Sequence, residues 1–219
     1  MTGDRARRPI VAIDGPAGAG KSTLARRLAE HLGIPYVNTG LMYRALTAEA
    51  SRQRLDVDDA EGLAQLALEL RFDLDWTISP PALTIDGQAP GPDLVAPEVE
   101  ATVSAVSRHP EVRRVMAVEQ RRLGAGGAVM EGRDIGSVIF PDADVKLFLQ
   151  AVPDERIQRR ERERGGGAGR EVTSRDALDA RVNPFVPAAG AVRIDTTGKS
   201  PDEVYEEALV AVRPGVGDG

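Results

Sequence analysis

Short apolar runs alternate along this chain with longer segments that have the features of helices. The apolar runs, typical of buried strands, occupy residues 10–14, 34–37, 126–131, 145–149 and 191–195. The segments between and after them are predicted helices, at residues 20–32, 39–54, 59–70, 97–107, 111–123, 153–164, 174–181 and 200–212. Strands that alternate with helices predict an α/β fold in which a five-stranded parallel sheet is flanked by helices.

Two of these helices carry signals at their first residues. Thr39 stands where a side-chain cap is expected for the helix at 39–54. Ser200 and Glu203 have the spacing of a capping box, and Pro201 fits the first position of the last helix.

Residues 72–94 depart from this pattern. Residues 72–78 and 82–86 alternate apolar with polar side chains, and the prolines at 80 and 81 supply a turn between them. This predicts a small antiparallel insert, which we place outside the main sheet. We expect Trp76 to be a packing residue of the insert rather than a platform on which a base stacks.

A glycine-rich run follows the first predicted strand and precedes the first predicted helix. It reads G-x-x-x-x-G-K-S-T and comprises Gly15, Pro16, Ala17, Gly18, Ala19, Gly20, Lys21, Ser22 and Thr23. In such a loop the backbone N–H groups surround a polyphosphate, Lys21 reaches the β- and γ-phosphates, and the Ser22 hydroxyl binds Mg²⁺. The run therefore predicts an ATP or GTP site with magnesium; the alternative is an ordinary glycine turn before a helix.

Composition narrows the possible classes of protein. A chain of 219 residues fits one α/β domain, and no apolar run approaches the roughly 18 residues that cross a membrane. The net charge of −6 argues against a nucleic-acid polymer as partner. The absence of cysteine excludes thiolate metal sites and Cys nucleophiles, and two histidines leave little for a His-based centre. We expect a cytoplasmic protein without a membrane anchor, and a monomer.

Polar residues follow most of the predicted parallel strands directly. The glycine-rich run follows the first strand, residues 38–40 the second, residues 132–134 the third and residues 195–197 the fifth. Ligands of parallel sheets bind beyond the carboxyl ends of the strands. A binding site at that edge of the sheet is therefore expected.

Several spaced motifs occur along the chain, at residues 13–22, 38–44, 103–104, 110–113, 131–136, 140–141, 175–179 and 194–197. Their order resembles that of the bacterial cytidylate kinases, which are P-loop nucleoside monophosphate kinases. The resemblance implies a single P-loop kinase domain over residues 1–219. It also implies a monophosphate-binding region at about 38–108, which contains the insert, and a short lid at about 159–174.

The resemblance also implies an activity and site residues. The reaction would move the γ-phosphoryl group of ATP to CMP or dCMP. The acceptor phosphate would be bound by Thr39, Arg44, Arg133 and Arg181, since paired guanidinium donors suit a phosphate. The base would contact Ser104, Arg113 and Asp134, and the ribose would contact Arg175 and Asp179.

Catalysis of this transfer needs no general base, because a phosphate monoester is already largely dianionic at neutral pH. The expected catalytic groups are cations: Lys21, Arg133, and Arg160 and Arg164 of the lid, which stand four residues apart on one helix face.

Two alternatives remain open from the sequence. One is a P-loop kinase for another small acceptor, such as UMP, AMP or shikimate. The other is a nucleotide-binding regulatory module, although the N-K-x-D motif that binds guanine is missing.

Overall fold

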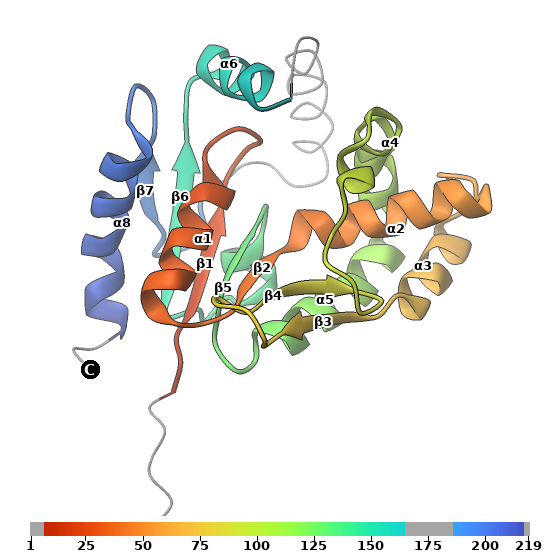
Figure 1. Ribbon diagram of the computed structural model, residues 1–219, viewed down its shortest axis with the longest axis horizontal. Helices are drawn as coiled ribbons and strands as arrows, with labels where there is room; N and C mark the ends of the chain where they lie inside the picture. Colours follow the sequence, from red (N-terminus) through yellow and green to blue (C-terminus); the bar gives the residue numbers. More distant parts are fainter. Residues whose placement is uncertain (1–6, 165–185, 217–219) are drawn as a thin grey trace, which may run out of the picture.

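Five neighbouring strands of the sheet run parallel, as the sequence predicts. The computed structural model describes residues 7–164 and 186–216, with side chains at 7–162 and 186–213. The strands stand in the order β2-β5-β1-β6-β7 and carry the bounds β1 Ile10–Asp14, β2 Tyr36–Asn38, β5 Ala128–Gly132, β6 Val145–Gln150 and β7 Val192–Asp195. Their carboxyl ends point the same way, toward the loop between β1 and α1 (Figure 1).

The insert extends this sheet instead of standing outside it, so that part of the prediction was wrong. Strands β3 (Phe72–Asp75) and β4 (Ala82–Ile85) pair antiparallel, and β4 joins the edge of β2. The Tyr36 backbone N–H donates to the Pro81 carbonyl at 2.8 Å, which pairs a group that would otherwise lie at an open edge. Phe72 and Leu83 are buried in the same apolar cluster as β1 and β5 residues. Within the described residues the sheet thus has the order β3-β4-β2-β5-β1-β6-β7.

Helices cover both faces of the sheet (Figure 1). Helices α1 (Lys21–Leu32) and α8 (Pro201–Val216) pack on the face where Val11 and Ile13 point, whereas Ala12 points to the opposite face. The opposite face carries α2 (Thr39–Gln53), α3 (Ala60–Glu69), α4 (Pro97–Ser107) and α5 (Pro110–Gly124). Short turns η1 (Pro92–Val95) and η2 (Ile135–Ile139) precede α4 and follow β5, and α6 (Pro153–Arg164) follows β6.

Two predictions about helix ends and one about a side chain of the insert can be compared with the structure. The capping box of α8 is confirmed, since the Ser200 hydroxyl accepts from the Glu203 N–H at 3.3 Å and the Glu203 carboxylate accepts from the Ser200 N–H at 2.8 Å. The cap of α2 is Asn38, whose side chain accepts from the Leu41 N–H at 3.2 Å, and not Thr39. Trp76 is 59% exposed and lies under the Arg8 guanidinium, so its predicted packing role was wrong.

Several predictions lie outside the described residues. These are the helix at 174–181, most of the lid at 159–174, and the site residues Arg175, Asp179 and Arg181. Among the helices that the structure describes, none is long and apolar enough to cross a membrane.

Candidate active site

The loop between β1 and α1 has a backbone that only glycine fits at its first position. Gly15 has a φ of 146°, and a Cβ atom there would stand 2.2 Å from the Leu149 carbonyl oxygen of β6. Gly20, with a φ of 89°, is the N-cap of α1. The loop is thus held against the sheet while α1 begins directly at Lys21, so the positive end of the helix dipole faces the loop.

Three cations bond to consecutive carbonyl groups of this loop. Arg133 donates to the Gly15 carbonyl at 2.7 Å and Lys21 donates to the Pro16 carbonyl at 2.7 Å. Arg156 of α6, which is buried, donates to the Ala17 carbonyl at 3.1 Å. Burial first, and then the positive charge of Arg133, lower the pKa of Lys21 well below its ordinary value. Such a concentration of positive charge favours a polyanionic ligand.

Asp14, at the end of β1, fixes the turn that carries Arg133. Its carboxylate accepts from the Ile135 and Gly136 N–H groups, each at 2.8 Å. Burial raises the pKa of Asp14 to about 6, against the lowering effect of these two bonds. The glycine-rich loop and the turn after β5 are therefore joined by one buried carboxylate.

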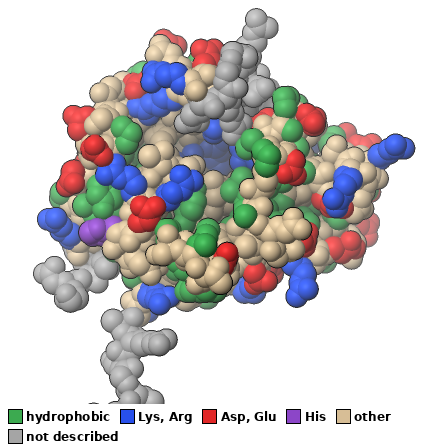
Figure 2. Space-filling view, in the orientation of Figure 1, with side chains coloured by type: hydrophobic (Ala, Val, Ile, Leu, Met, Phe, Trp, Pro, Cys, Tyr) green, Lys and Arg blue, Asp and Glu red, His purple; other side chains and the backbone are tan. Residues whose placement is uncertain are grey.

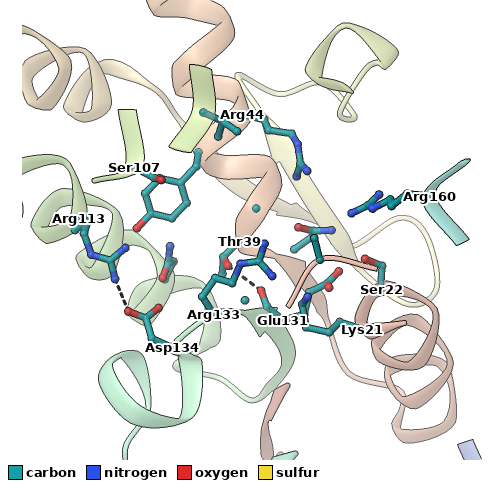
Figure 3. A pocket seen from close by; sticks show the side chains of 17 residues that line it. Lys21, Ser22, Thr39, Arg44, Ser107, Arg113, Glu131, Arg133, Asp134 and Arg160 are labelled. Carbon is teal, nitrogen blue, oxygen red and sulfur yellow. Dashed lines mark hydrogen bonds and ion pairs between the residues drawn. The ribbon is translucent and has the colours of Figure 1, made fainter. Parts of the chain in front are cut away.

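A cavity opens beside the loop, beyond the carboxyl ends of β1, β2 and β5. In Figure 2 Lys and Arg side chains gather in a hollow near the upper centre of the molecule. Figure 3 shows that the cavity has two different ends. Lys21, Ser22 and Arg160 stand at one end, and Arg113 and Asp134 at the other.

The wall between these ends is built by β2, α2 and α4. The Thr39 hydroxyl donates to the Glu131 carbonyl at 2.7 Å, which places it at the junction of β5 and α2. The Arg44 Nε donates to Glu100 of α4 at 2.7 Å, and the two side chains are only 8% and 5% exposed. Since Glu100 engages Nε, it orients the Arg44 guanidinium, which lines the cavity.

The Glu131 carboxylate accepts from the Tyr36 hydroxyl at 2.5 Å and lies inside the same cavity. Burial is the main cause that raises the pKa of Tyr36 far above its ordinary value. The tyrosine therefore remains a hydrogen-bond donor to Glu131 at any ordinary pH.

The far end holds a guanidinium and a carboxylate side by side. Arg113 of α5 forms an ion pair with Asp134, and both side chains line the cavity together with Tyr43 of α2. Burial raises the pKa of Tyr43 to about 12, so its hydroxyl stays protonated. This end thus presents donors and acceptors in a form suited to the edge of a heterocycle.

Comparison with known proteins agrees with this geometry. A family model described as cytidylate kinase matches residues 11–214. The chain belongs to the cytidylate kinase family. The cytidylate kinase of Solibacter usitatus (strain Ellin6076) is 41% identical over 232 residues, which cover 100% of this chain and 98% of that protein. The cytidylate kinase of Herpetosiphon aurantiacus is 45% identical, over 91% of this chain and 92% of that protein.

A further relative has a longer chain. The bifunctional pantoate ligase/cytidylate kinase of Synechococcus sp. (strain JA-2-3B'a(2-13)) is 41% identical, over 94% of this chain and 41% of that protein. Membership of the cytidylate kinase family confirms the resemblance that the spaced motifs indicated, and the sheet order agrees with the predicted α/β fold.

The cavity brings together most of the site residues predicted from the sequence that the structure describes. Those that line it are Ala17, Lys21, Ser22, Thr39, Arg44, Arg113, Arg133, Asp134 and Arg160. Ser104 is buried on α4 at 7% exposure but does not line the cavity, whereas Ser107, one turn later, does. The side chain of Arg164 lies outside the described residues, as do Arg175, Asp179 and Arg181.

Several residues of the site were missed in the sequence. Glu100 and Gln120 occupy ordinary helix positions, and nothing in their neighbours marks them as buried. Arg156 is one of 25 arginines, so its residue type carries no signal. Glu131 could have been found, because it is a carboxylate next to the last residue of a buried strand, directly before Gly132 and Arg133.

A second cavity lies on the other side of the glycine-rich loop. It is bounded by Gly18–Gly20 of the loop, by Arg159 and Arg162 of α6, and by the turn before α8. Arg159, at the start of the predicted lid, donates to the Thr196 hydroxyl at 2.9 Å and to its carbonyl at 2.6 Å. Residues of the glycine-rich loop therefore line both cavities.

The donor set for a metal ion is sparse. No group of three His, Cys, Asp or Glu side chains that could hold an ion occurs in the described part of the chain. The Ser22 hydroxyl lines the cavity one residue after Lys21. This arrangement fits an ion that enters with a phosphate ligand and takes few protein ligands, as magnesium does in nucleotide sites.

Proposed function

We propose that this protein transfers the γ-phosphoryl group of ATP to CMP or dCMP, forming ADP and CDP or dCDP. The observation that carries the proposal is the two-ended cavity of Figure 3. Cations at one end suit the phosphates, and the Arg113–Asp134 pair at the other suits a base. A nucleoside monophosphate spans two such ends, while shikimate would leave the second without a partner.

The acceptor phosphate enters the reaction as the nucleophile. Its second pKa is about 6, so at neutral pH an oxygen is ready to attack without a protein base. The work left to the protein is to neutralise charge and to align donor and acceptor. In this proposal Arg44 and Arg133 bind the acceptor phosphate, with the Thr39 hydroxyl at the end of β2 beside them.

Lys21 and Arg160 then act on the transferred group. Lys21 is half-buried, its pKa is lowered well below the ordinary value, and its ammonium donates to the backbone carbonyl of Pro16. Polyphosphate oxygens would restore the charged form and replace that carbonyl. Arg160, which lies at the same end of the cavity as Lys21 in Figure 3, would meet the charge that develops on the γ-phosphoryl oxygens.

Magnesium, when bound with ATP, would neutralise part of the charge on the β- and γ-phosphates. Ser22 is the residue that would hold it, through the side-chain hydroxyl. The nucleoside of ATP would lie in the second cavity, against Arg159 and the turn that contains Thr196.

At the base end, Asp134 would accept from the amino group of cytosine, and Arg113 would hold the Asp134 carboxylate in place while donating to the ring. Uracil presents a carbonyl oxygen where cytosine has its amino group, so the Asp134 carboxylate disfavours it. We also propose that the protein acts as a monomer, which sedimentation of the purified protein tests.

The decisive experiment is the rate of ADP formation with saturating ATP and Mg²⁺ and with CMP, dCMP, UMP, AMP or shikimate as acceptor. We expect CMP and dCMP to be the efficient acceptors. A rate with AMP or shikimate that equals the rate with CMP would indicate a kinase for a different acceptor. ATP binding without ADP formation for every acceptor would favour a regulatory module.

A further inference from the structure

Gln120 of α5 has a buried amide in the wall of the cavity. The residue is 2% exposed and lines the cavity. Its Nε2 has no hydrogen-bond partner, and among the residues that the structure describes no other fully buried side-chain nitrogen or oxygen is in this condition. A buried amide donor without an acceptor destabilises a folded protein. In a ligand cavity, such a donor indicates that the acceptor belongs to the ligand.

The position of Gln120 fixes which end of the ligand it would meet. Arg113 precedes it by seven residues, or two helical turns, so both side chains point from one face of α5 into the cavity. Arg113 in turn pairs with Asp134. The Gln120 amide therefore belongs to the end of the cavity that is opposite Lys21.

The Tyr43 hydroxyl does not satisfy this amide. Gln120 lies near enough to favour the ionised form of Tyr43, although burial outweighs this and raises the pKa of the phenol. The contact does not have the geometry of a hydrogen bond. The Gln120 amide is thus close to the Tyr43 hydroxyl but not bonded to it. A ligand atom between α2 and α5 could accept its hydrogen bond.

We propose that Gln120 is a further specificity-determining residue, whose Nε2 donates a hydrogen bond to a ring acceptor of cytosine, N3 or O2. This rests on the proposed function, which places the base beside Arg113 and Asp134. Cytosine presents one amino donor and two acceptors along the same edge. The Asp134 carboxylate serves only the donor, because an ionised carboxylate accepts and cannot donate. The Gln120 amide supplies a donor that complements the acceptors.

Replacement by methionine separates this role from a structural one. Gln120→Met keeps the length of the side chain and removes the unpaired donor. If the amide awaits a ligand, the thermal midpoint of the ligand-free protein stays unchanged or rises, because the buried polar group is gone. If the amide instead holds the fold together, the midpoint falls.

The experiment compares Gln120→Met with Gln65→Met, the same change at an exposed glutamine of α3. Calorimetry gives the Kd for CMP and dCMP, kinetics give the KM for ATP, and thermal unfolding gives the midpoint. We expect Gln120→Met to raise both Kd values about tenfold, the size of one neutral hydrogen bond, with an unchanged KM for ATP. Gln65→Met should alter none of these quantities.

The variant Gln120→Glu provides a second test, since it retains the shape and puts a carboxylate against the ring acceptors. It should weaken CMP binding more than methionine does. A larger loss for CMP than for UMP in Gln120→Met assigns the bond to N3, and equal losses assign it to O2, which the two bases share.

Two results overturn the inference. One is a Kd for CMP like that of the wild type in both Gln120→Met and Gln120→Glu. The other is a lowered thermal midpoint of Gln120→Met together with equal weakening of CMP binding and of the KM for ATP. Failure of the proposed function is a different outcome, because then the wild-type protein itself does not phosphorylate CMP.

Discussion

The charge on Asp14 should lower the stability of the protein as the pH rises through the weakly acidic range. Its pKa is raised from 3.8 to about 6 in the fold, chiefly by burial. Between these values the folded chain retains a proton that the unfolded chain has released, so stability falls as the pH increases. The difference between 3.8 and about 6 corresponds to about 3 kcal/mol of unfolding free energy, at 1.36 kcal/mol for each pH unit.

The perturbation is Asp14→Asn, which cannot titrate. Urea unfolding followed by circular dichroism from pH 4 to pH 7 gives the unfolding free energy of both proteins. The advantage of the wild type over Asp14→Asn should shrink by about 2–3 kcal/mol over this range. The variant should also raise the KM for CMP, because the Ile135 and Gly136 N–H groups lose a charged acceptor beside Arg133.

The matched control is Asp195→Asn, at the end of β7. Asp195 is exposed, and hydrogen bonds from Thr197 lower its pKa, so its contribution to stability is lost as the pH falls. The two variants should therefore show pH dependences of opposite sign. A wild-type advantage over Asp14→Asn that stays constant from pH 4 to pH 7 would refute the assignment of a buried, ionisable carboxylate under the turn.

Two further predictions concern the cations of the cavity. Lys21→Met should lower kcat by about 10²–10³, the cost of one charge-stabilising donor, while calorimetry shows little change in the Kd for CMP; a large loss of CMP binding would contradict the role given to Lys21. Glu100→Ala should lower the unfolding free energy by about 3–5 kcal/mol, because it leaves the Arg44 guanidinium buried without its Nε acceptor. The double replacement of Arg44 and Glu100 by methionine should recover stability in urea unfolding but not the KM for CMP; recovery of both would remove Arg44 from the phosphate site.

The sequence predicts the parts of the fold that depend on local pattern. The loop between β1 and α1 can be predicted from residues 15–21 alone, because the spacing of the glycines and the start of the helix are visible in the local sequence. Strands β1 and β5 are short, largely apolar runs that are buried on both faces, and this makes them easy to recognise in the sequence. These predictions are confirmed.

The predictions that failed depend on contacts between distant segments. The insert reads as a separate hairpin because its bond to the main sheet is one parallel contact, between Tyr36 and Ala82. Asn38 and Thr39 are both good caps, and the choice between them follows from where β2 ends and from the bond of Thr39 to the Glu131 carbonyl. A sequence pattern contains neither fact.

The candidate site divides in the same way. Lys21, Arg133 and Asp134 stand in motifs at strand ends, so the sequence points to them. Glu100 and Gln120 lie inside helices, where the sequence does not mark them. Glu100 matters to the site because it pairs with the Arg44 guanidinium, and Gln120 because its buried Nε2 has no hydrogen-bond acceptor. Only the packing of α4 and α5 against α2 reveals them.

The central claim is that one end of the cavity reads the base and the other transfers the phosphoryl group. The most direct measurement is kcat/KM for CMP and for UMP in the wild type, in Asp134→Asn and in Lys21→Met. Asp134→Asn should reduce the preference for CMP over UMP at least about tenfold, the low end of what one base contact contributes, whereas Lys21→Met should lower both values by the same factor. Equal losses for CMP and UMP in Asp134→Asn would contradict the claim.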